Sequence, residues 1–156
     1  MTDLIVRDAL ADADWNAVRA IREAVFVREQ ACPPEEEWDV HDVPDARGQT
    51  VHHLLGTVGG EPVACARWRL VGDARDVAKL ERFAVLVPFR GRGRGRALVE
   101  AALASARAAG FARFALNAQS HLVGFYASFG FVAVGDLFDE AGIEHMKMTL
   151  EDSGQP

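Results

Sequence analysis

One stretch of the sequence, residues 79–110, limits most strongly what this chain can fold into. An alternating apolar run is followed by the turn RGRGRG at residues 90–95 and then by an alanine-rich amphipathic segment. This pattern predicts a strand, a glycine-rich turn and a helix that ends at Gly110. Glycine at every second position removes Cβ atoms where the N–H groups of a helix N-terminus point outward. We therefore expect the turn to bind a phosphate group.

Two common phosphate-binding motifs do not fit this turn. A Walker loop requires Gly-Lys-Ser/Thr, but the lysines of the chain, Lys79 and Lys147, both lie outside the turn. A dinucleotide fingerprint requires the spacing G-x-G-x-x-G and a later acidic residue, and residues 111–119 contain none. The remaining motif is Arg-x-x-Gly-x-Gly. Taken alone, it leaves open an arginine-glycine RNA-binding tract and an ordinary strand-to-helix turn.

Length and charge narrow these alternatives. With 156 residues, the chain is expected to form a single domain over residues 1–150, followed by a flexible tail at residues 151–156. The net charge is −6, and the arginines at 90, 92, 94 and 96 leave 13 basic residues against 23 acidic ones elsewhere. An acidic chain with one basic turn suits a compact polyphosphate better than a nucleic acid.

The location expected from the sequence is the cytoplasm. The chain shows no secretory leader and no run of 18 apolar residues, so we expect no membrane association. Its cysteines, Cys32 and Cys65, are too few for a disulfide framework. Neither cysteine has a histidine at a sequence spacing that would indicate a nucleophilic pair. We expect both to be small core residues.

The periodicities of the rest of the chain predict a mixed α/β fold. Strands are expected at residues 4–6, 51–57, 63–71, 77–86, 113–118, 131–134 and 143–150, and helices at residues 15–30, 96–109 and 122–129. Asp12 or Asp14 would cap the first helix. The strands from residue 51 to residue 86 form an antiparallel meander, and the next helix allows a parallel βαβ unit. His52 and His53 would point to opposite sheet faces and are interpreted as structural.

A proline-led acidic loop at residues 33–42 has two interpretations. It could be a solvated loop whose Trp38 packs on the core. Alternatively, Glu36, Glu37, Trp38 and Asp39 could form a substrate-binding wall that attracts a cationic amine. The spacing of its acidic residues and histidine matches neither a calcium loop nor a zinc site, so no metal is expected.

Three motifs together resemble the GNAT superfamily of N-acetyltransferases over nearly the whole chain. They are RxxGxG at residues 90–95 after LERFAV, LNAQ at residues 116–119, and GFYASFGF at residues 124–131. With VFVREQ at residues 25–30 and EWDVHD at residues 37–42, the chain is most similar to the ElaA/YjcF-like branch. The resemblance implies the GNAT (acyl-CoA N-acyltransferase) fold, an α+β mixed sheet in which the antiparallel meander is followed by a βαβ unit with a splayed strand pair.

The same resemblance implies an enzyme that moves acetyl from acetyl-CoA to a primary amine by direct transfer in a ternary complex. Gln119 stands where many members of the family carry an asparagine. The residues that would bind acetyl-CoA are Phe83, Ala84, Val85, Arg90, Gly91, Arg92, Gly93, Arg94, Gly95, Arg96, Asn117, Gln119 and Tyr126. The acceptor would be a small-molecule or peptide amine, and a homodimer is common in the family. A non-catalytic acyl-CoA sensor and an RNA-binding domain are the alternatives.

Two residues are candidates for catalysis. By resemblance, the hydroxyl of Tyr126 would lie near the cofactor sulfur and act as general acid, whereas the alternative is a core aromatic residue. Glu81, expected on the same strand face as Lys79 and Phe83, would be the base, directly or through water. Its alternative is an ion pair with Lys79 or an arginine. His121 and His145 are rival bases.

Overall fold

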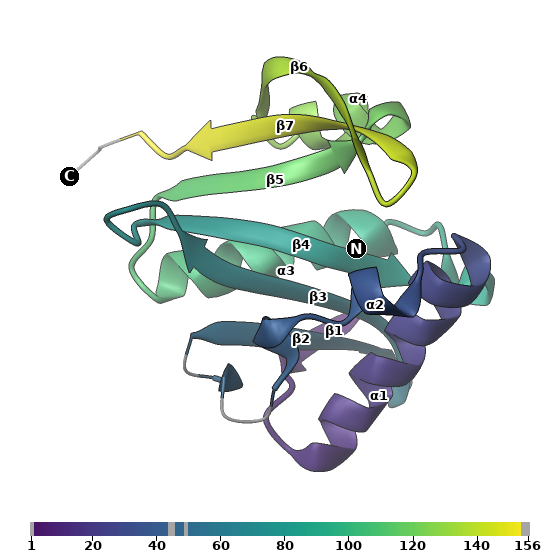
Figure 1. The fold of residues 1–156 in the computed structure, drawn as a ribbon. Coiled ribbons are helices and arrows are strands. Elements are labelled where there is room, and N and C mark those ends of the chain that lie inside the picture. The colour runs from purple at the N-terminus through teal and green to yellow at the C-terminus, as the bar shows by residue number, and fades with distance from the viewer. Residues whose placement is uncertain (1, 44–45, 49, 154–156) are drawn as a thin grey trace.

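The computed structural model describes residues 2–43, 46–48 and 50–153, in which the strands form a seven-stranded sheet of order β1-β2-β3-β4-β5-β7-β6 (Figure 1). Neighbouring strands pair in antiparallel fashion except β4 and β5, which are parallel. The strands are β1 (Ile5–Asp8), β2 (Val51–Val58), β3 (Glu61–Val71), β4 (Val77–Val85), β5 (Arg113–Gln119), β6 (Val132–Glu140) and β7 (Ile143–Glu151). The predicted mixed sheet, with a meander followed by a βαβ unit, is confirmed.

The helices differ from the prediction mainly at their ends. Helix α1 (Asp12–Arg22) begins after Ala11 with no side-chain cap, so Asp12 and Asp14 lie in the first turn rather than at the N-cap. The helix continues in π-helical turns, η1 (Glu23–Glu29). The predicted acidic loop contains α2 (Pro34–Glu37) and η2 (Val40–Asp42). The remaining helices are η4 (Val87–Phe89), α3 (Arg94–Ala108), η5 (Ser120–Leu122) and α4 (Val123–Ala127).

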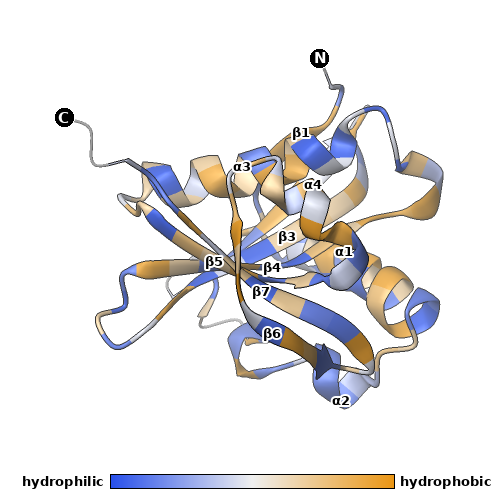
Figure 2. Cartoon of the chain, turned by 90° about the horizontal axis from the view of Figure 1, so that it is seen from above, coloured by the Kyte–Doolittle hydropathy of each residue, from blue (hydrophilic) through white to orange (hydrophobic). Residues whose placement is uncertain are grey.

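Two apolar clusters hold α1 and α3 against opposite faces of the sheet (Figure 1). Trp15, Val18 and Ile21 of α1 pack on Leu55 and Cys65. The larger cluster joins α3 to the other face. Hydrophobic and hydrophilic residues are mixed along the strands (Figure 2), but β2 and β3 are buried at most positions, as expected where helices cover both faces of a sheet. Of the adjacent histidines, His53 lies against Trp15 and His52 stacks on Trp68, so their predicted opposite orientation is confirmed.

The parallel pair β4 and β5 stays together for only part of its length. Val77, Ala78 and Lys79 pair with Arg113, Phe114 and Ala115, and no further pairs follow although both strands continue. Figure 1 shows the two strands diverging toward their C-terminal ends. Among the described residues, the backbone groups of residues 80–85 that face β5 therefore have no strand partner, which is the splayed arrangement that the family resemblance implied.

A β-bulge in β4 overturns one prediction. Arg67 pairs with Glu81 and Cys65 with Ala84, so two residues of β4, Arg82 and Phe83, stand opposite one residue of β3. Arg82 has a positive φ of 59°, which lets the strand absorb the extra residue. The side chain of Phe83 consequently packs on the α3 face of the sheet. Glu81 and Phe83 therefore do not share a face, because strict alternation holds only in an uninterrupted strand.

The C-terminal part of the chain is more ordered than predicted up to Asp152. Strand β6 extends to Glu140 instead of residue 134, and β7 includes Glu151. The Asp152 amide donates to the Ala112 carbonyl at 2.8 Å, and its carboxylate accepts two hydrogen bonds from Arg107. Residues 154–156 of the predicted tail lie outside the described residues. None of the described helices combines the length and the apolar character needed to cross a membrane.

Candidate active site

The glycine turn presents main-chain N–H groups at the start of α3. Gly91 and Gly93 have positive φ angles of 88° and 73°, and Gly93 is the N-cap of the helix. A Cβ atom added at either of them, or at Gly95, would meet no atom within 4 Å. Within the described part of the chain, no backbone or side-chain acceptor binds the N–H groups of Gly91, Arg92, Gly93, Gly95 and Arg96. Free amides at a helix N-terminus can receive a phosphate group.

Most arginine side chains of the turn are bound within the protein. Both terminal nitrogens of Arg90 bind Glu29 of η1, and its Nε donates to the Val85 carbonyl at 2.8 Å. Arg94 binds Asp3 through two nitrogens. Arg96 donates to the Ser128 hydroxyl at 2.6 Å and lies over the Phe129 ring. The turn therefore offers backbone amides more than mobile cations, which argues against the RNA-binding alternative.

The residues predicted to contact the pantetheine part of acetyl-CoA line both strands of the opening. Phe83, Ala84 and Val85 form the end of β4, beyond the last pair with β5. On β5, the Asn117 amide donates to Glu140 at 3.2 Å. The Gln119 amide donates to Gln30, at the end of η1, at 3.2 Å. This contact joins the far end of β5 to the helical segment that follows α1.

Tyr126 lies on α4 among aromatic rings. Phe83, Phe125 and Phe131 have ring centroids 6.1, 5.1 and 6.3 Å from its own. Its side chain is largely buried, and this desolvation raises the pKa of the phenol to about 12. The hydroxyl consequently remains protonated at neutral pH and can act as a hydrogen-bond donor.

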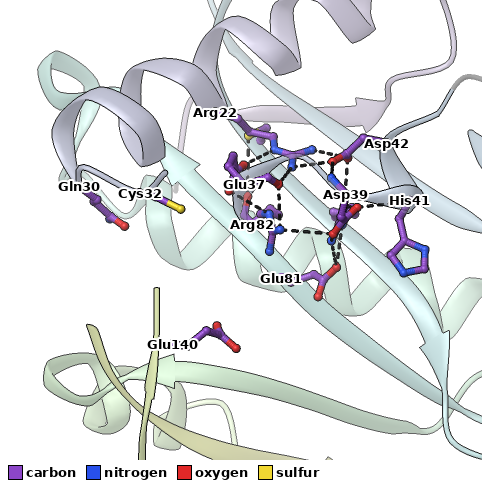
Figure 3. Close-up of polar contacts among 12 residues, drawn as sticks. Arg22, Gln30, Cys32, Glu37, Asp39, His41, Asp42, Glu81, Arg82 and Glu140 are labelled. Carbon is purple, nitrogen blue, oxygen red and sulfur yellow. Dashed lines mark hydrogen bonds and ion pairs between the residues drawn. The ribbon is translucent and has the colours of Figure 1, made fainter. Parts of the chain in front are cut away.

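A buried arginine network joins α1, α2, η2, β3 and β4 (Figure 3). Its members are Arg22, Arg67 and Arg82 with the carboxylates of Glu37, Asp39, Asp42 and Glu81. Arg22 is fully buried and binds Glu37 and Asp42, both at 2.6 Å. Arg67 is 1% exposed and binds Asp39, Asp42 and Glu81. The guanidinium donors thus hold three carboxylates of the residue 37–42 segment against the sheet.

Glu81 is bound as firmly as the other carboxylates of the network. It accepts from Arg67 Nε at 2.7 Å and from Arg69 Nε at 3.0 Å, and Lys79 Nζ lies 3.5 Å away. Burial alone would raise the pKa of Glu81, but these cations outweigh burial and lower it to about 2. A carboxylate with so low a pKa is a weak proton acceptor. The geometry favours the ion-pair interpretation of Glu81 over that of the catalytic base.

The acidic segment is neither a solvated loop nor a row of free carboxylates. Glu37 and Asp39 are engaged by arginines, and the ring of Trp38 is covered by Arg19 and Arg22 at 5.2 and 4.5 Å from its centroid. Among the four residues of the predicted substrate-binding wall, only Glu36 is exposed. The two carboxylates and the aromatic face proposed for a cationic amine are thus already occupied by arginines of the protein.

Several polar residues of this region were not singled out from the sequence. Arg22 and Arg67 could have been suspected, because each is a charged residue in an apolar context and buried charges require partners. Gln30 lies in the VFVREQ motif, but nothing in that motif indicates its contact with β5, and Glu140 carries no comparable signal because it approaches β5 only through the fold. The two histidines that are candidate bases differ in exposure: His121 is exposed, whereas His145 is buried beside Glu140.

Comparison with known proteins gives a consistent result. A family model described as an acetyltransferase (GNAT) domain matches residues 39–152. YjcF of Bacillus subtilis, named an uncharacterized N-acetyltransferase, is 36% identical over 129 residues, which cover 82% of this chain and 86% of YjcF. The crystal structure of Escherichia coli ElaA has a TM-score of 0.82 and 31% identity, covering 95% of this chain and 99% of ElaA. An acyl-CoA N-acyltransferase from Pseudomonas aeruginosa has a TM-score of 0.79 and 30% identity, covering 95% and 98%. The resemblance drawn from the sequence motifs is confirmed.

Replacing Arg67 by methionine should destabilise the fold strongly. The substitution leaves Asp39 and Glu81 buried without their main counter-ion, which typically costs about 3–5 kcal/mol. Urea denaturation at pH 7 measures the change. Arg113→Met is the matched control, since Arg113 forms an exposed ion pair with Asp76 and should contribute at most about 1 kcal/mol. Equal effects of the two substitutions would contradict the central place of Arg67.

Stability should fall as the pH is lowered from 7 to 5. Burial and the nearby Arg22 lower the pKa of His53 from 6.5 to about 4, so between these values the unfolded chain binds a proton that the folded chain does not. The stabilisation is complete above pH 6.5 and is lost as the pH falls toward 4, with about 2 kcal/mol lost at pH 5. His53→Leu should flatten this slope in urea titrations, whereas exposed His121→Leu should not. An unchanged slope in His53→Leu would assign it to other groups.

Proposed function

The chain belongs to the GNAT acetyltransferase family, and we propose that it moves an acetyl group from acetyl-CoA to a primary amine by direct transfer in a ternary complex. Acyl transfer in general follows from the family. The proposal that acetyl-CoA is the donor rests on one observation: the unpaired edge of β4 leads directly to the free amides of the glycine turn. Together they offer extended hydrogen-bonding groups beside an anion site, which suits a pantetheine chain joined to a pyrophosphate.

The proposed donor site has separate parts for the separate chemical groups of acetyl-CoA. The N–H groups of residues 91–96 would bind the pyrophosphate, assisted by the dipole of α3. Main-chain groups of Phe83, Ala84 and Val85 would bind the pantetheine amides, with Asn117 and Gln119 on the opposite strand. Arg90 already donates to the Val85 carbonyl, so this carbonyl has one lone pair left for a ligand.

Acetyl-CoA supplies the acetyl group as an activated thioester, and the protein has to orient it and manage protons. The proposed role of Tyr126 is to donate a hydrogen bond and then a proton to the departing sulfur. Its raised pKa keeps the proton on the phenol until negative charge develops nearby. We assign Glu81 a structural role in the arginine network, which holds the bulge of β4 in place. The acceptor is a small-molecule or peptide amine.

Acetyl-CoA at 100 times its dissociation constant should stabilise the protein by about 2.7 kcal/mol in a thermal-shift assay, whereas ATP and NAD should not. Gly93→Asp should abolish this response, because a carboxylate would then occupy the anion site. Gly59→Asp is the matched control: Gly59 also has a positive φ, of 57°, and open space around its Cβ position, but lies in the β2–β3 turn. Retained acetyl-CoA binding in Gly93→Asp would refute the proposed donor site.

Tyr126→Phe should lower kcat for acetyl transfer about 10²- to 10⁴-fold, the range expected for a lost general acid. The affinity for acetyl-CoA, measured by calorimetry, should stay within a factor of about two, because the ring and its aromatic neighbours remain. The comparison separates catalysis from binding. Equal turnover by the variant would remove Tyr126 from the mechanism, whereas acetyl-CoA binding without any turnover in the unmodified protein would favour the acyl-CoA sensor.

A further inference from the structure

The hairpin of β6 and β7 brings a glutamate and a histidine to the C-terminal end of β5. Glu140 ends β6, and His145 of β7 pairs directly with Gln119 of β5 and with Phe138 of β6. Directly paired residues share a sheet face, so His145 lies on the same face as Gln119. This face is opposite the cluster packed on α3, and it borders the opening between β4 and β5.

The hydrogen bonds of His145 determine what its second nitrogen can do. Nδ1 is 2.7 Å from the Ile143 carbonyl, so Nδ1 carries the hydrogen and donates it. In the neutral ring, Nε2 is then an acceptor, and it faces Oε2 of Glu140 at 3.6 Å. The other carboxylate oxygen of Glu140 accepts from the Asn117 amide. Two acceptors therefore face each other, and a group that donates two hydrogen bonds would satisfy both.

Glu140 differs from the other carboxylates near the opening. Glu37, Asp39, Asp42 and Glu81 all bind arginines. Glu140 has no arginine or lysine nitrogen within 4 Å among the described residues, and its side chain is 48% exposed. Figure 3 shows it apart from the network, across the opening from Cys32 and Arg82. Its negative charge is consequently available to a ligand.

The surroundings of His145 contain few competing charges. From β6 it faces the Phe138 ring, at 6.0 Å between centroids, and the Glu140 carboxylate. On its own strand the next residue of the same face is Lys147, which is exposed and pairs with Asn117. From β5 it faces Gln119, whose amide binds Gln30 of the segment after α1. Asp139 and Glu144 pair with each other and are the strand neighbours of Phe138 and His145, so their side chains point to the other face of the sheet.

We propose that Glu140 and His145 bind the ammonium group of the acceptor and that His145 takes its proton. One N–H of the ammonium donates to Oε2 of Glu140 and another to Nε2 of His145. Transfer of one proton to Nε2 gives an imidazolium paired with Glu140 and a neutral amine. The amine nitrogen then bonds to the acetyl carbon, the carbon–sulfur bond breaks, and the sulfur takes a proton from Tyr126. The proton that the new amide nitrogen loses restores Tyr126 through solvent, and His145 releases its proton to water.

This inference rests on the proposed function and adds the residues that bind its primary-amine acceptor, as the ammonium ion, and take its proton. A quaternary ammonium has the same charge but no N–H donor, so it should bind much more weakly. The Glu140 carboxylate would provide the affinity for the ammonium group, and His145 would accept its proton. The sequence alone left four candidates for this proton acceptor: Glu81, His121, His145 and water.

Binding can be tested without turnover. The imidazole resonances of His145 are followed by NMR in the full chain with CoA present, during titration with n-butylammonium and with tetramethylammonium. We expect saturable shifts with n-butylammonium and at least tenfold weaker binding of tetramethylammonium. Glu140→Gln should weaken n-butylammonium binding at least tenfold, and Glu144→Gln in the same hairpin should not. Absent shifts, or equal responses to the two cations, would overturn the inference.

The proton-transfer step has its own readout. On the fastest acceptor among n-butylamine, spermidine, tyramine and Nα-acetyl-lysine, His145→Gln should lower kcat at least 100-fold and remove the acidic limb of the pH profile. Glu140→Gln should mainly raise the KM for the amine. Loss of the limb in His121→Gln instead would refute the role of His145. A normal thermal shift with acetyl-CoA but no His145 response would overturn this inference alone, whereas a missing acetyl-CoA response would overturn the proposed function.

Discussion

The burial of two guanidinium groups between the sheet and α1 is the constraint on which the candidate site depends. Arg22 and Arg67 could not remain in that position without carboxylates, because an unpaired buried charge is strongly destabilising. The chain supplies these carboxylates from residues 37–42 and from Glu81, so a segment rich in like charges is fixed against β3 and β4. Arg82 joins the same network from the bulge of β4. The ion pairs and the bulge thus support each other, and together they shape the free edge of β4.

The strand, turn and helix of residues 77–110 could be predicted because their signals are local. Alternation of apolar residues, repeated glycines and an alanine-rich face each act over a few neighbouring positions. The bulge was not predicted, although Glu81 and Arg82 are consecutive polar residues that interrupt the alternation. The positive φ of Arg82 accompanies ion pairs with Glu37 and Asp39, which lie more than 40 positions away in the sequence and give no local signal. The same limit applied to the acidic segment. Its partners, Arg22 and Arg67, lie far from it in sequence, so its charge density alone indicated either a solvated loop or a substrate-binding wall.

The arginines of the glycine turn show how composition can mislead when the partners are unknown. From the sequence, they formed a local concentration of positive charge that was compatible with RNA. In the fold, Arg90 and Arg94 bind Glu29 and Asp3, and Arg96 is held by Ser128. These contacts tie the turn to η1, to the N-terminal segment and to the residue after α4. The side chains therefore position the turn, and the main-chain amides remain for the ligand, as the glycine pattern alone had suggested.

The opening between β4 and β5 has two walls of unequal electrostatic character. The wall made by β4 and the segment after α1 is neutralised internally, because every carboxylate of the network binds an arginine. The wall made by β5 and the β6–β7 hairpin keeps an uncompensated carboxylate, Glu140. A charge that already stabilises the fold cannot bind a ligand without loss of stability. Glu140, by contrast, contacts only the Asn117 amide and His145 among the polar groups of the described residues. Recognition of a cation is therefore least costly at the hairpin, where changes of sequence leave the arginine network intact.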